Sequence, residues 1–80
     1  MLFRRNKKEK EVYQIVFCDD KDITTEIGRE RKDYPTYEAA KNVIFSKNCG
    51  WGNAIKEVCG DMVRVDGDLW LTIQKVTKNY

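Results

Sequence analysis

Alternating apolar and polar positions predict β-strands in the first third of the chain. Residues Val12–Phe17 alternate with period two, in a stretch of β-branched and aromatic side chains that is typical of a strand. After a polar turn, Ile23, Thr25 and Ile27 alternate again, which predicts a second strand. We expect this strand to continue into the charged run 29–33, because charged residues protect the edge of a sheet from unwanted pairing.

The middle of the chain changes to a helical pattern. Apolar residues recur at i, i+3 and i+7 on one face of a helix: Tyr37, Ala40 and Ile44. Thr36 follows the single proline and is suited to cap the helix N-terminus. We predict a helix over Tyr37–Asn48, which Gly50 ends by adopting a left-handed conformation.

The last third contains a hairpin signal. The Asp-Gly-Asp segment 66–68 separates the alternating stretches Met62–Val65 and Leu69–Val76. A three-residue loop gathers the apolar residues of both stretches on one side, whereas a two-residue loop would mix Arg64 into that side. We therefore predict the three-residue loop, which places Arg64 opposite Trp70 on the other face.

The remaining segment, Asn53–Cys59, suits either a short helix or a strand before the hairpin, and we favour the strand. The predicted fold class is α+β: a small antiparallel sheet of about four strands with one helix packed on one face, in the order β-β-α-β-β. One helix covers only one face of such a sheet. The other face, with Arg64, Trp70 and Thr72, is then expected to stay open unless a partner or the N-terminus covers it.

Charge divides the chain into two parts. The first ten residues carry five basic side chains and one acidic one, a net charge of +4, whereas the whole chain is +2. We therefore predict a basic N-terminal arm, 1–10, attached to a single domain, 11–80, that is slightly acidic. Hydrophobic residues at 41% and charged residues at 35% indicate a folded globular domain, and 80 residues suffice for one small core.

Catalytic and metal chemistry find little support in the sequence. The chain has no histidine, which removes the usual base of a serine or cysteine nucleophile. Its three cysteines are widely spaced and too few for a structural zinc site without histidine. The acidic turns lack the ligand spacing of a calcium loop. We expect no enzyme activity, no catalytic residue, no metal and no cofactor.

The apolar runs also bear on location. None approaches the roughly 20 residues that a membrane-spanning helix needs, and the apolar start 1–3 is too short for a signal peptide. An odd number of cysteines without a C-x-x-C pair is typical of reduced thiols. We expect a cytoplasmic protein with no membrane partner.

Two tryptophans and the arm are the candidate binding residues. Trp51 lies between two glycines, where it either covers the core or is presented to a partner. Trp70, beside Arg64, is expected on the open face, where it either forms a cation–π pair or anchors a partner. The basic candidates for nucleic acid or an acidic protein surface are Arg4, Arg5, Lys7, Lys8 and Lys10. The alternative is that the arm is a disordered, solubilising tail that needs no partner.

These patterns favour a non-enzymatic protein-interaction module, such as a small inhibitor or an accessory regulatory protein that binds a larger protein. Small size, high charge and absent catalytic residues are typical of regulators encoded by phages or mobile elements. The alternative is an accessory nucleic-acid-binding protein that uses the basic arm. A third prediction is a homodimer through the open face of the sheet.

Overall fold

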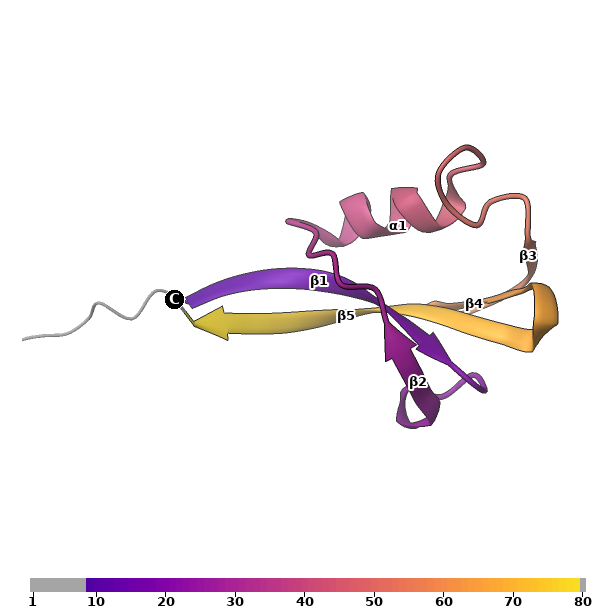
Figure 1. Ribbon diagram of the computed structural model, residues 1–80, viewed down its shortest axis with the longest axis horizontal. Coiled ribbons are helices and arrows are strands. Elements are labelled where there is room, and N and C mark those ends of the chain that lie inside the picture. The colour runs from indigo at the N-terminus through magenta and orange to yellow at the C-terminus, as the bar shows by residue number, and fades with distance from the viewer. Residues whose placement is uncertain (1–8, 80) are drawn as a thin grey trace, which may run out of the picture.

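One antiparallel sheet of five strands and one α-helix make up the part of the chain that the computed structural model describes, residues 9–79 (Figure 1). The strand order is β2-β1-β5-β4-β3. The strands are β1 (Glu9–Cys18), β2 (Glu26–Arg29), β3 (Ile55–Cys59), β4 (Met62–Val65) and β5 (Leu69–Asn79).

The α+β class is therefore confirmed, but the expected strand count and order are wrong. The described chain runs β-β-α-β-β-β instead of β-β-α-β-β. The preferred strand within Asn53–Cys59 is confirmed as β3, and the expected order of four strands was wrong because it did not include this fifth strand. β3 pairs with β4 through a tight turn at Gly60, where φ is +60°. Pairing with β4 satisfies backbone groups that a short helix would leave unpaired at its ends.

The predicted register of the last hairpin is confirmed. Arg64 lies opposite Trp70, across the three-residue loop Asp66–Asp68. Within this loop Gly67 and Asp68 have φ of 79° and 62°, so the chain turns through two left-handed residues. A slip by one residue would move every apolar side chain of β4 to the opposite face, which is why burial fixes this register.

The second predicted strand is shorter than expected. Ile23–Thr25 form a 3₁₀ turn, η1, and only β2 continues as a strand, ending at Arg29. The carboxylate of Asp22 accepts a hydrogen bond from the Thr24 amide at 2.9 Å, and the Thr25 hydroxyl donates to the Asp22 carbonyl at 2.6 Å. These local side-chain contacts compete with strand pairing, and alternation alone does not reveal them.

The helix α1 (Tyr37–Phe45) begins where predicted and ends three residues early. The Thr36 hydroxyl accepts a hydrogen bond from the Ala39 amide at 3.1 Å, which confirms the N-cap. At the other end Ser46 is already extended. Among residues 9–79, no helix is long and apolar enough to cross a bilayer.

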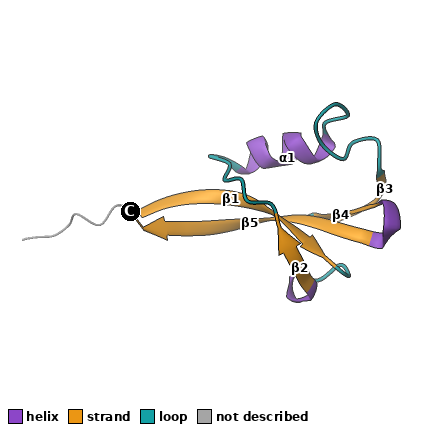
Figure 2. Cartoon of the chain, viewed as in Figure 1, coloured by secondary structure: helices purple, strands orange, loops and turns teal. Residues whose placement is uncertain are grey.

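Both faces of the sheet carry a small core. On the α1 side, Ile15 and Leu71 are fully buried beneath Ala40 and Ile44. On the other face, a second cluster consists of Val16, Cys18 and Trp70, with Met62 packed against it. Figures 1 and 2 show α1 on one side of the sheet and β2, with η1, turned to the other.

The expectation of an open second face is therefore wrong at Trp70, which is 6% exposed. Thr72 is also buried, and its hydroxyl donates to the Asp61 carbonyl at 3.2 Å. Cys18 lies directly opposite Trp70 on β1. Figure 1 shows β2 turned toward this face of the twisted sheet, the face that α1 does not cover.

Candidate functional site

The loop after α1 folds back onto the end of the helix. The Trp51 amide donates to the Ile44 carbonyl at 3.0 Å, and the Gly52 amide donates to the Ser46 carbonyl at 2.9 Å. Carbonyls at the end of a helix lack partners within the helix. The loop therefore caps α1 and at the same time fixes the main chain at Trp51.

Close packing, not a left-handed conformation, explains the two glycines beside Trp51. Gly50 is not among the residues with positive φ, so the prediction that it ends the helix in this way is wrong. A Cβ at Gly50 would lie 1.6 Å from the Val43 carbonyl oxygen, and one at Gly52 would lie 2.3 Å from the Phe45 oxygen. Only glycine allows the loop to approach the helix this closely.

Trp51 itself is half-buried and packs against the core, as one of its two expected roles required. Its ring packs edge-on against Phe17, with centroids 5.8 Å apart and planes at 69°. The exposed part of the ring lines a hollow of about 330 Å³. We call this surface the Trp51 hollow; its residues are Phe17, Ile27, Gly28, Trp51 and Leu69.

Ile27 is the most exposed apolar side chain of this surface, at 66%. It projects from β2, an edge strand of the sheet. Complete burial of a side chain of this size is worth at most about 1.5–3 kcal/mol before the costs of association are subtracted. The Trp51 hollow therefore offers an apolar surface in which the capping loop holds the main chain of Trp51 in place.

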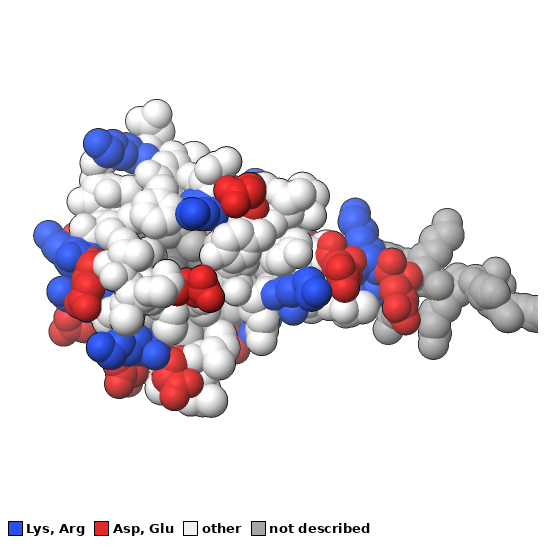
Figure 3. Space-filling model, turned by 180° about the vertical axis from the view of Figure 1, so that it is seen from behind, with Lys and Arg blue, Asp and Glu red and all other residues white. Residues whose placement is uncertain are grey.

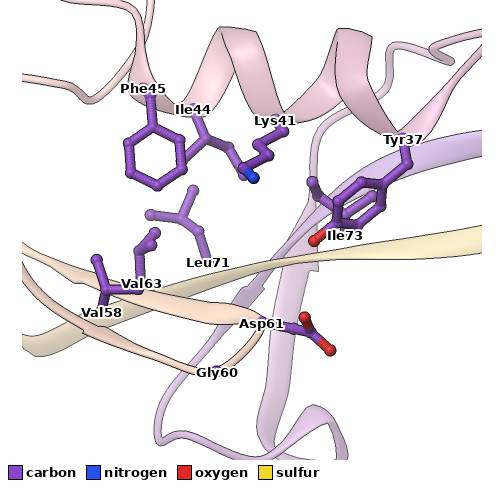
Figure 4. Close-up of a pocket in the computed structure, with 10 residues that line it drawn as sticks. All are labelled: Tyr37, Lys41, Ile44, Phe45, Val58, Gly60, Asp61, Val63, Leu71 and Ile73. Atoms are coloured by element: carbon purple, nitrogen blue, oxygen red, sulfur yellow. The ribbon is translucent and has the colours of Figure 1, made fainter.

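A second hollow, of about 220 Å³, lies between the helix and the β3–β4 hairpin (Figure 4). We call it the α1–β3 groove. The helix contributes Lys41, Ile44 and Phe45, and the strands contribute Val58, Val63 and Leu71. Two of these side chains are exposed in spite of their apolar character: Val58 at 58% and Phe45 at 42%.

The other two predicted partner residues lie away from both hollows. Trp70 is in the second core cluster, on the face opposite Trp51. Arg64 is engaged within the chain: its Nε lies 3.2 Å from a carboxylate oxygen of Glu57, and its Nη1 lies 3.2 Å from one of Asp68. The structure therefore does not bring Trp51, Trp70 and Arg64 together into one site.

The predicted basic residues mostly fall outside the described part of the chain. Outside the described residues lie Arg4, Arg5, Lys7 and Lys8. Lys10 is an exposed residue of β1, opposite Lys78. On the face drawn in Figure 3, lysine and arginine side chains alternate with aspartate and glutamate. This face of the folded domain is therefore not a broad basic surface.

A chain of polar contacts stabilises the face away from α1. The Asp33 carboxylate accepts hydrogen bonds from Gln14 Nε2 and Lys78 Nζ, both at 2.7 Å. Gln14 also accepts one from Arg29 at 2.9 Å, and Arg29 is paired with Glu26 at 2.7 Å. The hydrogen bonds from Gln14 and Lys78 lower the pKa of Asp33, because they favour the ionised carboxylate.

Two buried groups stay protonated at neutral pH. Burial raises the pKa of the Cys18 thiol, and the nearby Glu26 carboxylate raises it further. Burial and the hydrogen bond to Glu30 raise the pKa of Tyr34 to about 12. A thiol becomes reactive when its pKa is lowered, so Cys18 is held in its unreactive form. Residues 9–79 contain no group of three or more potential metal ligands.

Comparison with known protein families, with curated proteins and with solved structures gave no match. Sequence patterns also did not single out Ile27, Phe45 or Val58, which carry the exposed part of the two hollows. A sequence signal for exposure existed for Phe45, because this apolar residue lies outside the stripe of Tyr37, Ala40 and Ile44 that faces the sheet. Ile27 and Val58 fitted ordinary strand alternation, and their exposure depends on being at sheet edges.

Proposed function

We propose that this protein is a non-enzymatic interaction module that binds a larger protein, in the manner of a small inhibitor or accessory regulator. The observation that carries the proposal is the exposed Ile27 beside the half-buried Trp51, in a hollow formed almost entirely by apolar side chains. Exposed apolar surfaces of this kind mark interaction sites on soluble domains.

The arrangement also limits the cost of binding. The amide of Trp51 is tied to the helix, and its ring rests on Phe17, so a partner does not have to immobilise this side chain. Preorganised aromatic residues are common among the residues that dominate binding energy. In this proposal Trp70 and Arg64 support the fold, and Trp51 provides the contact.

The proposal is tested by one charge substitution and its matched control. Ile27→Asp places a carboxylate in the Trp51 hollow, whereas Ile23→Asp makes the same change on η1, where Ile23 is 41% exposed and lines neither hollow. The tagged full chain and both variants are used to capture proteins from an extract of the organism that encodes it. We expect the wild type and Ile23→Asp to retain the same protein and Ile27→Asp to lose it.

Thermal unfolding of both variants serves as the folding control, because substitutions of exposed residues change stability little. A partner retained equally by all three proteins would contradict a role for the Trp51 hollow. Failure of the folded wild type to retain any protein would contradict the interaction module itself.

A second proposal is an accessory nucleic-acid-binding function led by the basic arm, and its net charge of +4 favours it. Contacts between lysine or arginine and phosphate give affinity that falls steeply with salt. The test is titration of the full chain and a 1–8 deletion with duplex DNA and single-stranded RNA at about 50 and 200 mM salt. This deletion removes four of the five basic residues of the arm and leaves β1 whole. Binding that requires the arm and weakens with salt would support this function, and absence of binding at low salt would reject it.

A further inference from the structure

We propose that the α1–β3 groove is a second binding site, which takes an extended peptide that carries a carboxylate and an apolar side chain on the same face. This site is separate from the Trp51 hollow and does not depend on it. The partner is a segment of another protein that adds as a strand to the edge of the sheet. Three features of the groove support this occupant: its apolar floor, its unpaired edge and its charge.

The groove is apolar where a peptide side chain would enter. Val63 and Leu71 form its floor, and Ile44 lies on the helix wall (Figure 4). Val58 and Phe45 flank the opening and are exposed at 58% and 42%. An apolar side chain seated between them would remove both from water, which favours binding in proportion to the area covered.

The strand beside the groove is the last one of the sheet. In the described chain β3 pairs with β4 alone, and its other edge carries no strand. Cys59 and Met62 close the tight turn, and Val58 lies opposite Val63 one pair further on. Since hydrogen-bonded and non-hydrogen-bonded pairs alternate, the N–H and C=O of Val58 point to the open edge. An extended peptide can pair with these groups and direct alternate side chains into the groove.

Charge indicates what the peptide carries. Lys41 extends from α1 toward the groove, as Figure 4 shows, and is exposed. Its ammonium group forms no ion pair with any residue of the 9–79 range. Asp61 lies on the opposite wall, at the β3–β4 turn. A peptide carboxylate is therefore attracted to the helix side and repelled from the turn, which fixes its position across the groove.

The carboxylate can come from the end of a chain or from an acidic side chain, and the experiment distinguishes the two. Random hexapeptides are displayed in two forms, one with a free C-terminus and one followed by further residues, and both are selected on the full-length protein. We expect enriched peptides with an apolar residue two positions from a carboxylate. Enrichment in the first form alone indicates a chain end, whereas enrichment in both forms indicates a side chain.

The selected peptide is then synthesised with a fluorescent label, and its Kd is measured by anisotropy. Lys41→Gln is expected to weaken binding about fivefold, since it removes one partly exposed ion pair. Lys47→Gln, which neutralises an exposed lysine outside the groove, is the matched control and is expected to leave the Kd unchanged.

The edge contact is tested at Val58. Val58→Pro removes the outward N–H, which an edge strand tolerates, and is expected to weaken binding about tenfold. Val58→Ala keeps that N–H and loses only apolar contact, so it is expected to weaken binding less than Val58→Pro does. Val58→Asp is a second variant, for the case in which Val58→Pro does not fold. It keeps the main-chain N–H and places a negative charge at the opening of the groove, so it is expected to weaken binding by repelling the peptide carboxylate.

Several results would overturn the proposal. One is enrichment of peptides without a carboxylate, and another is an equal Kd for the Lys41 and Lys47 variants. A third is amide shifts in ¹⁵N spectra that fall on the Trp51 hollow instead of the groove. Sedimentation completes the test: a dimer that Val58→Pro converts to a monomer would show that a second copy of this chain occupies the edge.

Discussion

The main-chain N–H of Trp51 donates to the carbonyl of Ile44 at 3.0 Å, and this bond joins the loop after the helix to its last turn. It satisfies a carbonyl that the helix end would leave unpaired. It also holds Trp51 over Phe17, so a single backbone contact links the end of α1 to the surface proposed for partner binding.

Gly50→Ala should destabilise the protein by about 3 kcal/mol. Its new Cβ would lie 1.6 Å from the Val43 carbonyl oxygen, so the loop would have to move away from the helix. The free energy of unfolding in urea measures the loss. Gly28→Ala is the matched control, because its Cβ would meet Phe17 at an ordinary 4.0 Å. Equal stability of the two variants would show that the loop is not tightly packed.

Trp70→Ala should cost about 3–4 kcal/mol, since Trp70 is buried in the second core cluster beside Cys18. Trp70→Phe keeps an apolar ring and should lose much less. Ile27→Ala, at an exposed position, should stay within about 0.5 kcal/mol of the wild type. The measurement is urea unfolding followed by circular dichroism, and a stable Trp70→Ala protein would restore the idea of an open second face.

Stability should depend on the ionisation of Asp33 below about pH 4. Its folded-state pKa is lowered by Gln14 and Lys78, so its contribution is present above the unfolded-state pKa and is lost as the pH falls through the folded-state pKa. Asp33→Asn should therefore be less stable than the wild type at pH 7, and the two should converge in acid.

Urea unfolding between pH 2 and pH 7 checks this expectation. Lys78→Met removes one of the two donors and should reproduce part of the effect. Lys47→Met, at an exposed position, should follow the wild-type curve. Parallel curves for the wild type and Asp33→Asn over the whole range would rule out the proposed linkage.

Two of the three thiols should react quickly in the folded protein. Cys49 and Cys59 are exposed, whereas Cys18 is buried and burial raises its pKa. A thiol reagent such as DTNB should therefore titrate two groups at once and the third only with unfolding. In the Cys18→Ser variant the slow reaction should disappear, and rapid labelling of Cys18 in the wild type would mean that the second core cluster opens readily.

Local signals predicted much of the fold. Thr36 caps the helix as expected, because an N-cap depends on residues three positions apart. Arg64 lies opposite Trp70 as expected, because the loop and the burial of alternate residues fix the register of a hairpin. The end of α1 was predicted three residues late, because the capping contacts come from a loop whose path the helix pattern does not show.

The candidate surfaces were predicted less well. Trp51 was recognised from its two glycines, but Ile27 and Val58 were not, although both are more than half exposed. Strand alternation gives the face on which a side chain lies and not the position of its strand in the sheet. Exposure at β2 and β3 follows from their places at the two edges.

The sequence by itself determined the α+β class, the helix start and the pairing of the last hairpin, since periodicity, capping residues and turn residues are local signals. Only the tertiary structure decided that Trp70 is buried, that Gly50 is required by close approach, and that apolar side chains line two separate hollows. These features arise where segments distant in the chain meet, as Cys18 meets Trp70 across the sheet. Twist and strand order determine such contacts, and local residue patterns do not encode either one directly.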